Sequence, residues 1–276
     1  MFTVIKATGE KEPFSEEKVL SSIKRAGVPD SLQKFVLDKV KKSLYDNIPT
    51  SEIYEIIIRT LSESEQPYSR ARYSLKQAIM MLGPTGYPFE DFVAKVLSEH
   101  GYKTKTRQIL SGKCVTHEVD IIAEKNGKRI MVEAKFHNNS GTRSDVHVAL
   151  YVKARFDDLK DRYEFNEGWI VTNTKSTIDA NAYAECSGMK IISWNYPQGE
   201  SLRELVEASH LHPITMLTTL STSQKLKLLK NKIIMCRDLL THKSYLEMIG
   251  LSPKEKEDAL NEIKYICTSP FERERI

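Results

Sequence analysis

The chain has 276 residues, of which 40% are hydrophobic and 28% are charged. These proportions are typical of a globular protein with two or three domains, rather than of a disordered or fibrous chain. The net charge of +4 permits a polyanionic partner but is too small to predict one. Four scattered cysteines show no zinc-site spacing. No apolar run approaches the roughly 18 residues of a membrane span, and MFTVIKATGEKEPF lacks the apolar core of a signal peptide. We therefore expect a cytoplasmic protein without membrane association.

The first segment predicts a short hairpin followed by helices. FTVIKATGEKEPF turns at Gly9, and Ser15 can cap a helix that continues through Ala26. Apolar residues at helical spacing predict three further helices, at residues 32–44, 50–61 and 68–81. The run Gly83-Pro84-Thr85-Gly86 breaks this pattern, so we place the end of the first domain at residue 83.

The second segment, residues 84–198, predicts alternating helices and strands. Helices are expected at residues 89–100, 146–163 and 176–186, and strands at 102–110, 115–125, 128–136, 168–171 and 190–194. This order predicts a mixed sheet with helices on both faces. Beyond Pro197-Gln198-Gly199, residues 199–276 predict an all-helical domain, in which Ser252-Pro253-Lys254-Glu255 forms a capping box at a helix start.

The sequence VDIIAEKNGKRIMVEAKF, residues 119–136, carries the most specific local signal. Asn126-Gly127 lies between apolar runs, where it predicts a two-residue hairpin turn. Counting outward from this turn places Asp120 opposite Glu133, with Lys135 on the same face as Glu133. Two opposed carboxylates repel each other, so we expect a divalent metal ion to compensate them.

The stretches FEDFVAKVLSEHGY and HEVDIIAEKNGKRIMVEAKF resemble the PD-(D/E)xK nucleases, specifically their Mrr-like restriction-endonuclease branch. Val119 stands where that motif has its proline, a variation that the family tolerates. The resemblance implies a metal-dependent DNA endonuclease that uses Mg²⁺ or Mn²⁺. The implied catalytic residues are Glu90, Asp120, Glu133 and Lys135. The implied metal ligands are Asp120, Glu133 and the carbonyl of Ala134, with Glu90 as an auxiliary ligand and Lys135 positioning the attacking water.

These residue types suit phosphodiester hydrolysis. Carboxylates and a carbonyl provide the hard oxygen ligands that Mg²⁺ prefers, and the bound cation lowers the pKa of a water and neutralises the scissile phosphate. The alternative for the site is a solvated hairpin face with salt bridges, each worth about 0 to 1 kcal/mol. The alternatives for the whole chain are a non-catalytic nucleic-acid-binding or nucleotide-responsive regulatory protein on a nuclease scaffold, and a junction-resolving nuclease.

Several other polar side chains near this segment could contact DNA, although a solvated or hydrogen-bonded role is the more common one. Candidates beside the site are His117, His137, His147 and Tyr151. Candidates for contacts to backbone phosphates are Arg143, Lys153 and Arg155.

The first segment resembles the ATP-cone domain, a nucleotide-sensing module, in VIKATGEKEPFSEEKV, IPTSEIYEII and RARYSLKQAI. The matching positions are Val4, Lys6, Gly9, Glu12, Phe14, Lys18 and Thr50. The resemblance implies that ATP or dATP binds, with Lys6 and Lys18 on the triphosphate and Glu12 and Thr50 lining the nucleotide. Ala7 stands where the family has an arginine, which removes a bidentate phosphate donor. A small helical domain used for docking or dimerisation is the alternative.

The last segment contains LHPITMLTTLSTSQKLKLLKNKIIMCRDLL, which resembles helix-hairpin-helix DNA-binding modules but lacks their glycine between Thr218 and Lys232. Its lysines could follow phosphates, or its helix could pack on the nuclease. The sequence as a whole predicts a multidomain α/β protein. Its parts are a small helical ATP-cone-like domain (1–83), a restriction-endonuclease-like α/β domain with a mixed central sheet (84–198) and an all-α domain (199–276). We expect DNA as a partner and a homo-oligomeric state.

Overall fold

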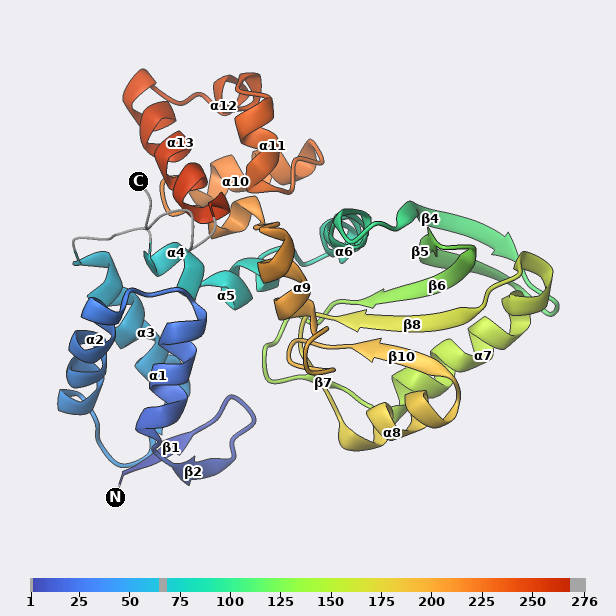
Figure 1. Ribbon diagram of the computed structural model, residues 1–276, viewed down its shortest axis with the longest axis horizontal. Helices are drawn as coiled ribbons and strands as arrows, with labels where there is room; N and C mark the ends of the chain where they lie inside the picture. Colours follow the sequence, from blue (N-terminus) through green and yellow to red (C-terminus); the bar gives the residue numbers. More distant parts are fainter. Residues whose placement is uncertain (1, 65–68, 269–276) are drawn as a thin grey trace. The chain divides into compact units, whose positions relative to one another are not determined.

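The computed structural model describes residues 2–64 and 69–268 (Figure 1). The chain divides into two compact units. One contains the residues up to Ala78, together with Ile214–Lys227 and the residues from Cys236 onward. The other contains Ile79–Pro213 and Leu228–Met235.

The N-terminal part of the first unit combines a small sheet with helices. Its strands are β1 (Thr3–Ile5), β2 (Lys11–Pro13) and β3 (Ile48–Pro49), in the order β2-β1-β3. Its helices are α1 (Glu16–Arg25), α2 (Asp30–Lys42), α3 (Thr50–Ser62), α4 (Ser69–Tyr73) and the start of α5 (Leu75–Met80). Ser15 accepts a hydrogen bond from the Lys18 amide, 3.2 Å, so its predicted capping role is confirmed. Buried aliphatic side chains such as Ile23 and Ile57 form the core.

The helix predicted at residues 68–81 is interrupted. Tyr68 lies outside the described residues, and α4 ends at Tyr73 before α5 begins at Leu75. At the junction, the Ser74 hydroxyl donates a hydrogen bond to the Ala71 carbonyl, 2.7 Å. The prediction of one continuous helix is wrong here, and a serine side chain that bonds to the backbone of the preceding turn accompanies the break.

The described residues of the second unit form a five-stranded mixed sheet in the order β10-β8-β6-β5-β4. Its strands are β4 (Lys103–Ser111), β5 (Thr116–Lys125), β6 (Lys128–Lys135), β8 (Glu167–Thr172) and β10 (Met189–Ile192). Strands β4, β5 and β6 are antiparallel neighbours, whereas β6, β8 and β10 are parallel. A short parallel pair, β7 (Arg143–Ser144) with β9 (Lys175–Ser176), was not predicted.

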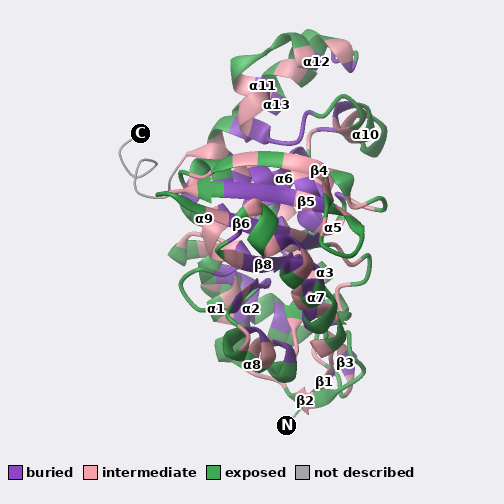
Figure 2. Cartoon of the chain, turned by 90° about the vertical axis from the view of Figure 1, so that its right-hand side faces the viewer, coloured by how far each residue is buried: buried purple, intermediate pink, exposed green. Residues whose placement is uncertain are grey.

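Helices cover both faces of this sheet, as predicted (Figure 1). Helix α6 (Tyr87–Glu99) lies on one face, and α7 (Val146–Tyr163) and α8 (Ile178–Cys186) lie on the other. Val152 and Phe156 of α7 share a buried cluster with Met131 and Ile170 of the sheet. The middle strands are the most deeply buried part of the unit (Figure 2). Helix α9 (Leu202–Ser209) follows the last strand.

The β5–β6 hairpin has the predicted turn and register. Asn126 and Gly127 have φ values of 52° and 75°, the positive region that this turn requires. The pairing continues from Lys125 opposite Lys128 to Ile121 opposite Val132. The next residues along this register are Asp120 and Glu133.

The C-terminal elements are η1 (Ile214–Met216), α10 (Thr222–Lys230), α11 (Cys236–Thr241), α12 (Ser244–Met248) and α13 (Pro253–Cys267). The predicted capping box is confirmed, because Ser252 and Glu255 each accept a hydrogen bond from the other's backbone amide. Residues 269–276, predicted as helical, lie outside the described residues. Within the described part of the chain, no helix combines the length and apolar character needed to span a bilayer.

Candidate metal centre and nucleotide pocket

Asp120 lies where the regular pairing of β5 is interrupted. Its neighbours Val119 and Ile121 pair with β4, but the residue opposite Asp120, Arg107, has a φ of 51°. The Asp120 side chain reaches β6, where its Oδ2 accepts a hydrogen bond from the Ala134 amide, 2.8 Å. The carboxylate is therefore fixed beside the backbone that directly follows Glu133.

The environment of Asp120 disfavours its negative charge. Burial, followed by the nearby charge of Glu133, raises the pKa of this carboxyl to about 7. The Ala134 amide opposes this shift, Glu90 adds to it, and Arg155 opposes it. An acid whose charge is so poorly compensated is a suitable ligand for a cation.

Glu133 has a cationic partner that the sequence did not identify. Arg155 of α7 donates from Nη1 to Glu133 Oε2 and from Nη2 to the Glu118 carbonyl. Arg155 is only 9% exposed, so the idea that it is a surface contact for DNA phosphates does not fit its position. The sequence feature that could have indicated this burial is a spacing, because Val152, Arg155 and Leu159 lie on one face of the helix.

Glu90 and Lys135, the other predicted catalytic residues, are in contrasting environments. Glu90 is 9% exposed and forms an ion pair with Arg107, 3.2 Å, while Arg107 also binds Asp91, 2.7 Å. Burial raises the pKa of Glu90. Lys135 is exposed at the end of β6, and no described residue forms a hydrogen bond or ion pair with its ammonium group. Lys135 is therefore free to contact a ligand.

The donor set suits a hard divalent cation, although the carboxylates do not converge on one point. Among the described residues, no group of three His, Cys, Asp or Glu side chains is close enough to hold a metal ion. Asp120 and Glu133 nevertheless lie at one end of the hairpin, where the Ala134 amide binds Asp120. Two carboxylates and a carbonyl, completed by waters and substrate oxygens, are typical of Mg²⁺ sites. These residues are the ones that would hold the cation.

The histidines near the site have structural partners. His117 bonds to Asp158 of α7, 2.8 Å, and His137 bonds to the Ser144 hydroxyl, 2.9 Å. Burial lowers the pKa of His137, and the charge of Lys135 lowers it further. His147 and Tyr151 are exposed on α7. Their predicted contacts with a substrate stay predictions.

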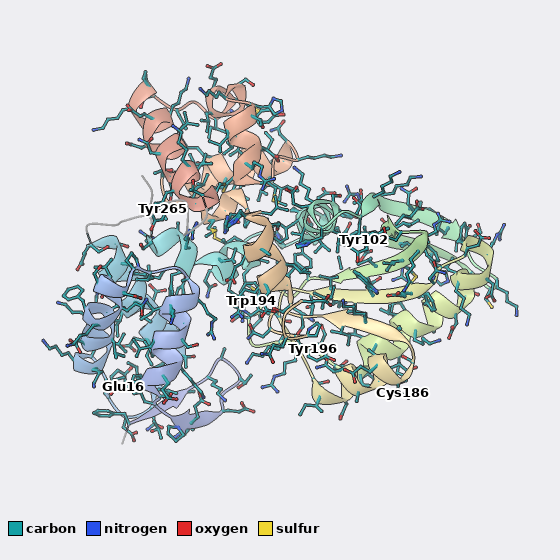
Figure 3. The ribbon with its side chains drawn as sticks, viewed as in Figure 1. Glu16, Tyr102, Cys186, Trp194, Tyr196 and Tyr265 are labelled. Atoms are coloured by element: carbon teal, nitrogen blue, oxygen red, sulfur yellow. The ribbon has the colours of Figure 1, made fainter. Side chains whose placement is uncertain are left out.

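A large open hollow of about 750 Å³ lies at the other end of the hairpin, around Asn126 and Gly127. Two of its basic side chains have partners in the domain: Lys128 binds Glu167, 2.8 Å, and Lys125 lies 4.9 Å from the centre of the ring of Tyr102, which is labelled in Figure 3. None of the four predicted catalytic residues lines this hollow.

The nucleotide-binding residues predicted in the first unit are close together. Glu12 Oε2 accepts from both Lys6 Nζ, 2.8 Å, and Lys18 Nζ, 2.9 Å. These hydrogen bonds, with that from Lys6 the larger effect, lower the pKa of Glu12. Glu12, Lys18 and Thr50 line a cavity of about 190 Å³, and Lys6 joins the group through Glu12.

The apolar part of this cavity contains an aromatic pair that the sequence did not reveal. Tyr54 of α3 and Tyr73 of α4 stack with ring centres 5.4 Å apart, and both line the cavity. The sequence feature that could have placed Tyr54 at the cavity is its position one helical turn after Thr50 on α3. The cavity is thus lined by one lysine, Lys18, and by two stacked aromatic rings.

Comparisons with known proteins agree with this architecture. The family model for the ATP cone domain matches residues 2–78, that for restriction endonuclease matches 83–206, and that described as AF1548-like, C-terminal, matches 212–267. An uncharacterized protein of Archaeoglobus fulgidus is 38% identical over 175 residues, which cover 63% of this chain and 99% of that protein.

Solved structures with similarity include the crystal structure of the protein of unknown function AF1548. It is 37% identical to this chain in sequence and superposes with a TM-score of 0.57. The match covers 66% of this chain and 98% of that chain. A repair endonuclease from Pyrococcus abyssi is 24% identical with a TM-score of 0.29, covering 36% of this chain and 41% of its own.

The fold is that of a multidomain α/β protein with a restriction-endonuclease-like domain. This chain belongs to the same family as the uncharacterized Archaeoglobus fulgidus protein, and it combines an N-terminal ATP cone, a restriction endonuclease domain and an AF1548-like C-terminal domain. Both resemblances inferred from residues of the first two segments are confirmed. Two expectations stay predictions. One is the position of the domain boundaries at residues 83 and 198, and the other is the similarity of the last segment to helix-hairpin-helix modules.

Proposed function

We propose that this protein is a divalent-metal-dependent DNA endonuclease whose activity responds to ATP or dATP bound by the ATP cone. The observation that carries the proposal is the poorly compensated carboxylate of Asp120 beside Glu133, in a restriction-endonuclease-like fold. Buried acids placed together lower stability unless a cation compensates them. Their presence at the end of the hairpin is therefore best explained by a function.

The chain's own residues would have separate roles in hydrolysis. Asp120, Glu133 and the Ala134 carbonyl would hold the cation, which when bound supplies an acidified water and neutralises phosphate charge. Lys135, whose ammonium group is exposed beside them, would orient the attacking water and stabilise the charge that develops on the phosphate. Glu90, held by Arg107, would add negative charge on the α6 side.

The nuclease activity can be tested with supercoiled plasmid in the presence of Mg²⁺ or Mn²⁺. We expect the wild-type protein to nick the plasmid and Lys135→Ala to lower the rate by a factor on the order of 100, because a charge-stabilising group is lost. Lys128→Ala is the matched control, since Lys128 is at the other end of the same strand and is 64% exposed. Equal rates for the two variants would contradict the role of Lys135.

The same assay separates the alternative functions. A wild-type protein that leaves linear, supercoiled, methylated and branched DNA intact would favour a regulatory or nucleic-acid-binding protein on a nuclease scaffold. Cleavage confined to branched DNA would favour a junction-resolving nuclease, which would use the same carboxylates on a different substrate.

Nucleotide binding is tested separately by isothermal titration with ATP and dATP. We expect Lys18→Ala to weaken binding by about tenfold or more, because a charge-assisted contact to phosphate is lost. Lys24→Ala, which removes an exposed lysine from the same helix, is expected to leave binding unchanged. If the wild-type protein gives no binding heat and no thermal shift, the proposed control by nucleotide is wrong.

A further inference from the structure

Arg155 makes three kinds of contact in the centre of the candidate site. Its guanidinium group donates to the Glu133 carboxylate and to the Glu118 carbonyl. It also lies 5.4 Å from the centre of the Tyr151 ring, on the same helix. The Arg155 side chain is 10% exposed and that of Glu133 is 15% exposed, so this ion pair is largely removed from water. Such a pair is strongly coupled, because removing either partner leaves an uncompensated charge.

The two carboxylates predicted to hold a metal ion each have a protein donor in this structure. Asp120 accepts from the Ala134 amide, and Glu133 accepts from Arg155. The third acid, Glu90, is bound by Arg107. Within residues 2–64 and 69–268, no three His, Cys, Asp or Glu side chains are placed to hold a metal ion together. These hydrogen bonds occupy only Oδ2 of Asp120 and Oε2 of Glu133, so the charges beside the carboxylates, rather than a lack of free oxygens, decide whether a metal ion can join them.

Arg155 is the donor whose charge conflicts with a metal ion. The Ala134 amide is neutral and can remain beside a coordinated carboxylate, whereas a guanidinium group and a divalent cation on one carboxylate repel each other. We propose that Arg155 is an internal counter-cation, which neutralises Glu133 while no metal ion is bound and must release it for metal binding. This inference rests on the proposed function. Arg155 is then a positioning residue, which stabilises the metal-free site and lowers its affinity for the metal ion.

The inference predicts opposite effects of one substitution on two measurements. Arg155→Met keeps the apolar packing of the side chain but leaves Glu133 without its cation. We expect the metal-free protein to melt at a lower temperature than the wild type. We expect Mn²⁺, measured by isothermal titration at pH 8, to bind about tenfold more tightly, because no ion pair has to be broken first. Mn²⁺ should consequently raise the melting temperature of Arg155→Met more than that of the wild type.

Arg129 provides a matched control in the same unit. It also binds a carboxylate (Glu124, 3.2 Å), a backbone carbonyl (Tyr163, 2.9 Å) and an aromatic ring (Phe165, 5.3 Å). Arg129 is near the turn of the hairpin, away from Asp120. Arg129→Met should lower the melting temperature while leaving the affinity for Mn²⁺ unchanged.

The outcomes separate the inference from the proposed function. Tighter Mn²⁺ binding by Arg155→Met, with Arg129→Met unchanged, supports the counter-cation. If the wild type binds Mn²⁺ and Arg155→Met binds it equally or more weakly, Arg155 orients Glu133 rather than competing, and the inference is overturned alone. No Mn²⁺ binding by the wild type overturns both. If Arg155→Met does not fold, Arg155→Lys decides, since its single ammonium group holds Glu133 less firmly and should shift Mn²⁺ affinity in the same direction.

Discussion

Replacing Asp120 with asparagine is expected to slow plasmid nicking strongly and, at the same time, to stabilise the metal-free protein above pH 7. Asparagine retains an oxygen for the Ala134 amide but carries no charge with which to hold a cation. Because a principal metal ligand is lost, we expect the nicking rate to fall by a factor on the order of 1,000. The stability gain has a different cause, which is the burial of Asp120 near Glu133.

The pH dependence of this stability follows from the two pKa values of Asp120. The pKa is about 7 in the folded protein, whereas an aspartate in the unfolded chain has its ordinary pKa of 3.8. Between these values the folded protein holds a proton that the unfolded chain has lost, so stability falls as the pH rises. Above pH 7 the wild type should have lost on the order of 4 kcal/mol from this group, and Asp120→Asn should not show this loss.

Melting curves in EDTA between pH 5 and pH 8 would measure this difference. Asp161→Asn, an exposed substitution on α7, is the control and should follow the wild-type curve. A wild-type melting temperature that does not fall over this range would contradict the burial of an uncompensated Asp120. Undiminished nicking by Asp120→Asn would contradict its role as a ligand.

The hairpin that carries the candidate site could be predicted because its signals are local. Asn126-Gly127 fixes both the turn and the register, and register fixes which residues are opposite each other. Helix α7 was likewise predicted with its observed bounds, Val146–Tyr163, because its apolar positions repeat at helical spacing over 18 residues. Long periodic elements and tight turns contain enough information within themselves.

The charge compensation of the site could not be predicted in this way. Glu133 and Arg155 are 22 residues apart in sequence, and they meet only because α7 packs on the face of the sheet to which Glu133 points. The sequence showed that Arg155 shares a face with apolar residues, but not which acid it would contact. The two-residue strands β7 and β9 were missed for another reason, since so short a segment has no periodicity.

The sequence likewise does not reveal the contact partners of Glu262 of α13. Its position among Ala259, Ile263 and Ile266 places it on the buried side of this helix. It is 0% exposed. One oxygen accepts from the amide and hydroxyl of Thr218, both 2.7 Å. The other accepts from the amide, 2.9 Å, and hydroxyl, 2.6 Å, of Thr219. This carboxylate therefore satisfies four donors in the segment that connects η1 to α10.

Replacing Glu262 with alanine is expected to lower the free energy of unfolding of the first unit by about 3–5 kcal/mol, because four buried donors lose their acceptor and a cavity is created. Glu257→Ala, exposed on the same helix, should change it by less than about 0.5 kcal/mol. Denaturant unfolding measures both values. Hydrogen exchange provides a local readout, since the amides of Thr218 and Thr219 should lose protection in Glu262→Ala and keep it in Glu257→Ala. Retained protection at both threonines would show that the buried carboxylate does not hold this segment, and that its four hydrogen bonds are replaced by others when it is removed.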